Sequence, residues 1–311
     1  MKTFIKYAFI FFYLILSNIN IKSMEAINLD NINKNYHINS YFEYLLDKEN
    51  KLKIENFILK NANIKFTNDK KKIYKFGLTD SWYWIRFKIK NNSSYSWVLE
   101  IEEPLLNIIE LYEIRKNNQT SIKKSGISVE IKKKDYRSLN PAFDIKPEKQ
   151  EETVYYLHYK TSFFTKPFPV SIKTDKFFFE KEKEQNLLFG IIYGIILAIG
   201  IYNLILFFSI KDKVYLFYVF FAFFFAAFQM LRNGMLYMYF SFSNVRLLSS
   251  IYFISLYILI IIVLHFTRIT LYLKKVFPKI DYFFKLSIIF YTLNIFVVPI
   301  FYNKHHIIRA C

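Results

Sequence analysis

Apolar and polar residues alternate along the first half of the chain, from about residue 27 to residue 174. Alternation with a period of two is typical of strands that bury one face. Turn-forming residues separate the runs, as at 91–94, where two asparagines precede two serines. Six or more short strands at this spacing predict an antiparallel sandwich or jelly roll. The clearest runs are 82–90, 96–102, 108–114, 127–132, 153–160 and 168–174.

The second half follows a different pattern, in which long runs lack charged residues. The run 187–208 contains no charge, and at ~1.5 Å rise per residue a helix of this length crosses a ~30 Å hydrocarbon core. The runs 214–231, 247–266 and 284–302 have the same character, with Lys285 able to extend to the membrane surface. We therefore expect an α+β multi-domain membrane protein, in which a jelly-roll-like all-β sandwich precedes four transmembrane helices.

The two remaining segments complete the expected domain organisation. Lys2 and Lys6 precede an apolar run at 7–16, a length typical of a signal peptide. Residues 1–23 are predicted to be a signal peptide or an uncleaved anchor, and 27–174 an extracytoplasmic sensor domain. Residues 175–186 are predicted to be a linker, and 187–311 the membrane region.

Charge predicts the orientation of the helices and excludes one class of partner. The net charge is +18, and it is densest beside the apolar runs, where acidic residues are nearly absent. In the sandwich, lysines are largely balanced by acidic residues, so we expect no nucleic-acid binding. Basic residues also gather in the first and third loops, as at Lys211 and Lys274. Basic loops face the cytoplasm, which predicts a multi-pass inner-membrane protein with its N-terminal domain outside.

Two stretches carry short motifs. The first contains Phe76-Gly77-Leu78-Thr79-Asp80-Ser81, Trp84-Ile85-Arg86-Phe87, and Glu100 with Pro104-Leu105-Leu106. The second contains Gly190-Ile191-Ile192-Tyr193-Gly194, Tyr202-Asn203-Leu204, Lys211-Asp212-Lys213, Gln229 and Asn233-Gly234. In both stretches the chain resembles a bacterial family, the seven-transmembrane receptors with diverse intracellular signalling modules.

The resemblance implies an outer domain that senses a small ligand such as a carbohydrate. It also implies seven helices that pass the signal to a cytoplasmic cyclase, histidine kinase or phosphatase module. This chain has four predicted helices and nine residues after Tyr302, so we expect a truncated receptor without a cytoplasmic effector. The alternative is a non-signalling binding or adhesion module anchored in the membrane, or an inert remnant of an interrupted receptor gene.

One predicted strand offers a candidate ligand-binding site. Alternation along 82–90 directs Trp82, Trp84 and Arg86 to one face, and the opposite face is expected to join the core. Aromatic rings stack on apolar patches and a guanidinium binds a carboxylate through two bonds, so these three residues could bind a sugar or an acid. The structural alternative pairs Arg86 with Glu100 or Glu102 on a neighbouring strand.

Four residues of the first two membrane segments are candidates for helix packing. Gly190 and Gly194 form G-x-x-x-G, which lets two helix backbones approach closely, either within the bundle or in a homodimer. Asn203 and Gln229 lie in uncharged spans, where we expect a polar link between the two helices. The junction 176–185 would be either a mechanical coupler or a passive connection.

The sequence carries no pattern typical of an enzyme. It contains no G-x-S-x-G, no phosphate-binding glycine-rich loop and no H-E-x-x-H. Its five histidines and single cysteine, Cys311, show no metal-ligand spacing. We therefore expect no catalysis, cofactor or metal. The expected partners are the lipid bilayer, a small ligand, and either a second copy of the chain or a separate signalling protein.

Overall fold

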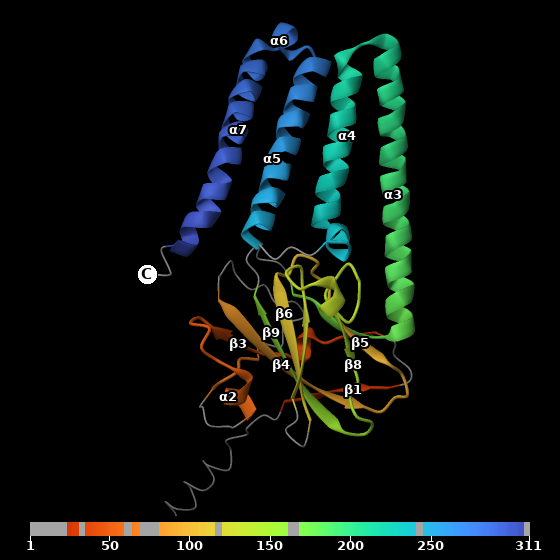
Figure 1. Ribbon diagram of the computed structural model, residues 1–311, viewed down its shortest axis with the longest axis vertical. Helices are drawn as coiled ribbons and strands as arrows, with labels where there is room; N and C mark the ends of the chain where they lie inside the picture. Colours follow the sequence, from red (N-terminus) through yellow and green to blue (C-terminus); the bar gives the residue numbers. More distant parts are fainter. Residues whose placement is uncertain are drawn as a thin grey trace, which may run out of the picture.

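The computed structural model describes residues 24–30, 35–58, 64–68, 81–115, 120–160, 168–240 and 245–307. These residues form a β-rich domain and a row of long helices that lies against one end of it (Figure 1). The expected fold class, an all-β domain followed by membrane helices, is confirmed. The predicted signal segment 1–23, the motif residues 76–80 and Cys311 lie outside the described residues.

Six strands among the described residues form the larger sheet. Its centre is β4, which has β9, β6 and β7 on one side, in that order. On the other side, β3 pairs with the first half of β4 and β1 with the second half, the latter in parallel. The bounds are β1 (Ala26–Leu29), β3 (Glu43–Asp47), β4 (Trp82–Asn91), β6 (Ile108–Ile114), β7 (Thr120–Ser125) and β9 (Glu152–Lys160).

The smaller sheet faces the larger one and is antiparallel, with the order β2, β10, β5, β8. One hydrophobic core fills the space between the sheets, with Ile85 and Phe87 from β4 packed in the same cluster as Leu99 and Ile172. The predicted core face of β4 is thereby confirmed. The bounds are β2 (Asn35–His37), β5 (Trp97–Ile101), β8 (Ala142–Ile145) and β10 (Val170–Thr174).

The strand expected at 127–132 is wrong. Gly126 has a φ of +111°, which turns the chain away from the sheet, and the Ile127 N–H donates to the Leu106 carbonyl. A turn and the short 3₁₀ helix η2 (Ile131–Lys133) occupy this segment. Alternation predicted a strand here because Ile127 is buried, but it is buried against the helices rather than in the sandwich. Conversely, the clearest alternating runs of the sequence do not include five strands of the structure, which are β1, β2, β3, β7 and β8.

Four helices in the described part of the chain are long and apolar enough to cross a membrane. They stand side by side in chain order (Figure 1), and each contains one of the expected spans. The bounds are α3 (Asp175–Ile210), α4 (Lys213–Arg232), α5 (Val245–Thr270) and α7 (Pro278–Ile307). Shorter helices are η1 (Asn39–Tyr41) and α2 (Ile54–Ile58) in the β-rich domain, and η3 (Met235–Met238) and α6 (Leu273–Val276) between the long helices.

The segment 175–186, expected as a linker, is the beginning of α3. The helix has 36 residues and is therefore about 54 Å long, well beyond the ~30 Å that the membrane requires. The Thr174 side chain caps its first turn by accepting a hydrogen bond from the Phe177 N–H. Strand β10 thus continues directly into the first membrane helix.

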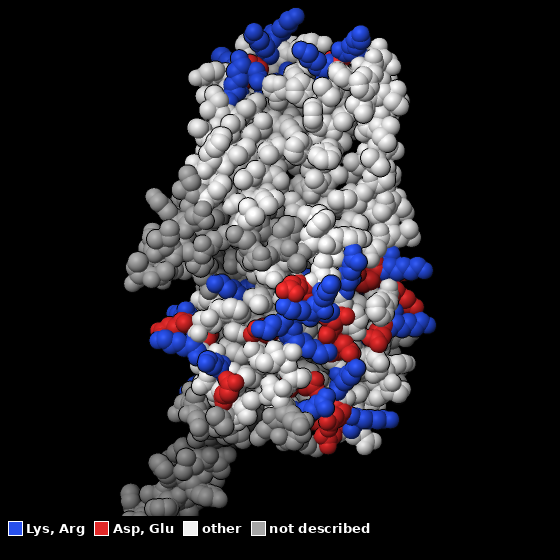
Figure 2. All heavy atoms as spheres, viewed as in Figure 1, with Lys and Arg blue, Asp and Glu red and all other residues white. Residues whose placement is uncertain are grey.

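Charged side chains gather at two levels of the molecule, over the sandwich and at the opposite end of the helices (Figure 2). The far end carries the basic residues of the loops that follow α3 and α5, including Lys211, Lys213, Lys274 and Lys275. The visible face of the helices between these levels is almost free of charge. Because basic loops face the cytoplasm, the sandwich lies on the outer side of the membrane.

Candidate functional site

The outward face of β4 is covered at Trp84 and partly exposed at Trp82 and Arg86. Trp84 is 1% exposed, and the ring of Phe57 on α2 lies 4.8 Å from it in an edge contact. Phe57 also stacks on Tyr156 of β9 at 5.5 Å. These aromatic residues, which we term the outer aromatic layer, form a second and smaller hydrophobic core beneath α2.

His158 of β9 lies against both tryptophans. Its ring is stacked 4.2 Å from Trp82 and 4.0 Å from Trp84, and its Nδ1 lies 3.1 Å from the Glu110 carboxylate. Burial raises the pKa of Glu110, but hydrogen bonds from His158, Lys124 and a tyrosine outweigh burial and lower the pKa to about 2. An ionised Glu110 therefore fixes the orientation of the imidazole ring.

Arg86 is bound to other parts of the outer domain. Its Nε lies 2.6 Å from the Glu43 carboxylate on β3, and its guanidinium lies 4.1 Å from the centre of the Phe66 ring. The expected pairing with Glu100 or Glu102 is wrong, because β5 belongs to the other sheet. The structure thus brings the three predicted ligand-binding residues together on one strand, while their role in binding stays a prediction.

Glu100 and Glu102 belong instead to an ion cluster beside the first turns of α3. Lys173 of β10 is fully buried and donates to both carboxylates, with Glu102 at 2.7 Å. Lys181 of α3 lies 3.0 Å from Glu102. Burial raises the pKa of Glu102, but hydrogen bonds and charges from the two lysines outweigh burial and lower the pKa to about 2. The cluster therefore ties β5, β10 and α3 together.

Residues 134–141, which we term the junction loop, connect the sandwich to two separate helical segments. The Tyr136 ring lies 5.2 Å from Phe178 of α3, and its hydroxyl lies 3.4 Å from Asp175. Arg137 Nε donates to the Met238 carbonyl of η3 at 2.7 Å. The same loop therefore contacts both the first membrane helix and the turn that follows the second.

Leu139 lies at the centre of these contacts. Its backbone N–H hydrogen-bonds the Glu182 carboxyl group on α3. On its other side lies Gly234, where an added Cβ would be 2.6 Å from the Leu139 carbonyl oxygen and 2.6 Å from Pro104 Cβ. Gly234 also has a φ of +81°, a backbone conformation that favours glycine. The backbones of the junction loop and of the turn after α4 are thus in direct contact.

An apolar cluster extends this contact. Leu105 and Ile127 from the sandwich pack with Leu231 of α4 and Tyr237 of η3, and partly buried residues of α5 surround them. The outer domain is therefore packed on the helices and is not merely attached through β10.

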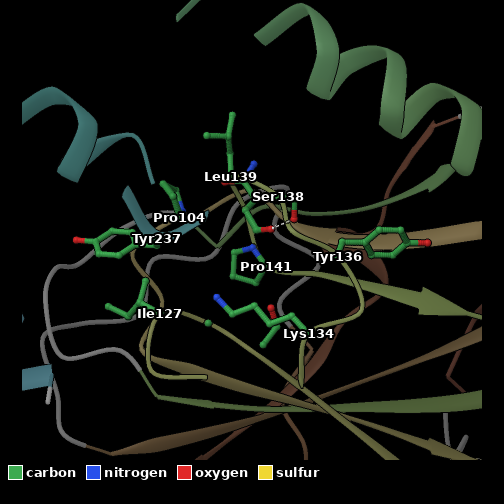
Figure 3. Close-up of a pocket in the computed structure, with 11 residues that line it drawn as sticks. Pro104, Ile127, Lys134, Tyr136, Ser138, Leu139, Pro141 and Tyr237 are labelled. Atoms are coloured by element: carbon green, nitrogen blue, oxygen red, sulfur yellow. Dashed lines mark hydrogen bonds between the residues drawn. The ribbon is translucent and has the colours of Figure 1, made fainter. Parts of the chain in front are cut away.

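A small cavity lies beside the junction loop (Figure 3). Its volume is about 10 Å³, which is room for about one water molecule, so a sugar does not fit. Lys134, Leu139 and Tyr237 are among the residues that line it, and burial lowers the pKa of Lys134. We interpret the cavity as a packing gap in the junction and not as a ligand pocket.

The candidate packing residues of the membrane helices differ from expectation. A Cβ added at Gly190 or Gly194 would meet nothing within 4 Å, so their expected contact within the bundle is not made, because both lie on an exposed face of α3. Asn203 Nδ2 donates to the Ile199 carbonyl of its own helix at 2.9 Å and forms no link to α4. Gln229 lies half-buried in the last turns of α4. Homodimer formation stays a prediction.

Two family descriptions match this chain. The description "7TMR-DISM extracellular 2" matches residues 39–174, and "7TM diverse intracellular signalling" matches residues 185–310. The first match coincides with the sandwich and the second with the long helices, and together they cover most of the chain. The chain belongs to the seven-transmembrane receptors with diverse intracellular signalling modules. No curated protein matches it.

Membership in this receptor family agrees with the architecture. The receptor is a multi-pass membrane protein with an extracellular N-terminal domain, and the junction loop lies within the extracellular match. Two residues of the motifs that carry the resemblance, Trp84 and Gly234, have structural positions in this receptor. Trp84 fills the outer aromatic layer, and Gly234 allows the junction loop to approach α4.

Sequence reasoning missed the junction of this receptor. Lys173 carries a usable signal, because it is the lone charge of strand β10, as Glu100 is of β5. Such a pair of charges predicts a buried ion pair. Glu182 lies in a run of alternating Glu and Lys, where no pattern distinguishes the buried residue from its exposed neighbours. His158 shows no metal-ligand spacing in the sequence, and its contact with Trp82 and Trp84 depends on the pairing of β9 with β4.

Proposed function

We propose that this receptor binds a small hydroxyl-bearing ligand, a carbohydrate, in the outer aromatic layer and transmits binding through the junction loop. The observation that carries the proposal is the junction loop itself, which bonds to α3 and packs on the turn after α4. The role proposed is binding and transmission rather than catalysis, since Glu110 and Arg86 already hold protein partners.

Two unpartnered nitrogens support the ligand part of the proposal. Among the described residues, Trp84 Nε1 and His158 Nε2 are buried without a hydrogen-bond partner, although buried polar atoms are normally bonded. A ligand hydroxyl can accept from the indole N–H and donate to the unprotonated imidazole nitrogen. Trp84 is covered by α2, so binding requires this five-residue helix to move. Ligand binding is thereby linked to a change of shape in the outer domain.

The transmission part requires two arrangements of the junction. A ligand shifts a protein between two arrangements only through its differential affinity for them. The movement of α2 provides such a difference within the sandwich. The contacts of Tyr136, Arg137 and Leu139 provide the physical connection to the helices.

The ligand part is tested on the full chain in lipid nanodiscs with a panel of neutral mono- and disaccharides. All three tryptophans lie in the sandwich, so their fluorescence reports its thermal unfolding. A sugar present at 100 times its Kd should add about 2.7 kcal/mol to the stability. His158→Phe should abolish this gain, whereas the matched control Tyr155→Phe, which removes an unpartnered hydroxyl in the core, should retain it. Equal binding by His158→Phe, or no response to any sugar, would refute the ligand part.

The transmission part is tested with glycine variants. Gly234→Ala would press a Cβ against Leu139, whereas Gly200→Ala meets nothing within 4 Å and serves as the control. Spin labels at Lys211 and Lys274, with Cys311 replaced by serine, report the distance between the cytoplasmic loops. The ligand should change this distance in the parent and in Gly200→Ala, but not in Gly234→Ala. An unchanged response in Gly234→Ala would exclude transmission through this contact.

A further inference from the structure

Glu182 is a buried carboxyl group on the part of α3 that lies beside the sandwich. The uncharged run that crosses the membrane begins at residue 187, so Glu182 lies outside the hydrocarbon core. It is 8% exposed, while its neighbours Lys183 and Glu184 are exposed. The helix therefore directs this one acidic side chain into the contact with the outer domain.

The groups that face Glu182 cannot neutralise it completely. Glu100 comes from β5, Lys173 from β10 and Lys181 from α3 itself. Glu102 joins the group as a partner of both lysines. Lys173 donates to Glu100 and to Glu102, and Lys181 donates to Glu102. Three carboxyl groups thus share two ammonium groups, which leaves one negative charge in excess when all are ionised.

The hydrogen bonds of Glu182 are also incomplete. Its carboxyl group is bonded by the Leu139 N–H, but among the described residues its Oε1 is buried without a partner. Burying a carboxylate oxygen without a hydrogen-bond partner costs free energy. Protonation lowers this cost because it removes the negative charge. Burial and the charge of Glu100 raise the pKa of Glu182, whereas the Leu139 N–H and the two lysines lower it. The first two effects are larger, and the pKa of Glu182 is raised to about 7.

We propose that Glu182 is a proton-binding site, and that proton uptake from the outer side strengthens the docking of α3 on the sandwich. The proton is thus a second input to the receptor, alongside the small ligand. The regulatory consequence rests on the proposed function of the junction, whereas the proton site itself does not.

The direction of the effect follows from linkage. The docked state binds the proton more tightly than the undocked state, in which the carboxyl group returns to its ordinary pKa of 4.5. The proton therefore contributes its full stabilisation of the docked state at a pH below about 4.5. This stabilisation is lost as the pH rises through about 7. One proton changes the docking equilibrium by at most about tenfold per pH unit within this window.

The proton site is tested by infrared spectroscopy on the full chain. The absorption of a protonated carboxyl group should titrate near pH 7 in the parent protein. It should be absent from Glu182→Gln and present in the matched control Glu184→Gln, which alters an exposed neighbour. If no carboxyl group titrates above pH 6, or if the band persists in Glu182→Gln, the proton site does not exist.

Docking is tested with spin labels at Lys146 on the sandwich and Lys183 on α3, with Cys311 replaced by serine. In the parent protein the distance distribution should broaden as the pH rises from 4.5 to 8, whereas Glu182→Gln should keep the narrow low-pH distribution throughout. A titrating infrared band with no change in distance would overturn the control of docking while leaving the ligand proposal intact. The same pH response in Glu182→Gln would also overturn it.

Discussion

Replacing Lys173 with methionine would show how strongly the ion cluster holds the outer domain together. Lys173 is fully buried, and its partner Glu100 is 1% exposed. Methionine fills a similar volume, so the variant removes the charge without leaving a large cavity. Glu102 keeps Lys181 as a partner. Among the described residues, Glu100 keeps the Asn140 amide alone, which donates to its other oxygen at 2.7 Å.

The expected cost can be bounded in two ways. Removing one partner of a buried ion pair costs about 3–5 kcal/mol. The variant can limit the cost by taking up a proton on Glu100, and protonating an ordinary glutamate side chain at pH 7 costs about 3.7 kcal/mol. We therefore expect a loss of about 3–4 kcal/mol at pH 7. This loss should shrink by about 1.4 kcal/mol for each pH unit of acidification.

The assay is urea unfolding of the full chain in detergent, followed by tryptophan fluorescence from the sandwich. The matched control is Lys88→Met, which removes the lysine of a partly exposed pair with Glu152 at 3.0 Å and should cost no more than about 1 kcal/mol. Two results would contradict the expectation for Lys173→Met: a loss of stability no larger than that of the control, and a loss of stability that does not decrease between pH 7 and pH 5. Either result would show that the variant does not leave a buried, uncompensated charge in the cluster.

Two further predictions concern the sandwich. Trp84→Ala should destabilise it by about 3–5 kcal/mol, as measured by urea unfolding, because the ring fills the outer aromatic layer; a loss below about 1 kcal/mol would mean that this layer is not packed. Acid should lower the melting temperature, because the pKa values of Glu102 and Glu110 are lowered to about 2. Their contribution to stability is complete above about pH 4.5 and is lost as the pH falls towards 2, so an unchanged melting temperature between pH 4.5 and pH 3 would contradict these ion pairs.

Local patterns predicted those features that depend on only a few neighbouring residues. The alternation along β4 assigned Tyr83, Ile85, Phe87 and Ile89 to the core correctly, because successive side chains of a strand point to opposite faces. The same rule failed at 127–132, since Ile127 is buried by α4 and η3, and alternation alone does not say which surface buries a side chain.

Partners distant in sequence could not be predicted in the same way. Arg86 was expected to pair with β5, yet it pairs with Glu43 on β3, because β5 lies in the other sheet. His158 had no neighbour in the sequence that indicated its contact with two tryptophans. Such contacts depend on the order of the strands in the two sheets. The same alternating runs are compatible with many strand orders, so the sequence does not choose among them.

The sequence alone determined that the chain has a β-rich outer part and four membrane helices. Runs of about 20 residues without charge have no favourable place in water, and a helix in lipid satisfies its own backbone hydrogen bonds, so length and hydropathy suffice. Only the tertiary structure decided which charged residues meet beside α3. A lone charge in a strand can indicate that Lys173 and Glu100 are buried, but that they meet each other and Glu182 depends on where β5, β10 and α3 pack together.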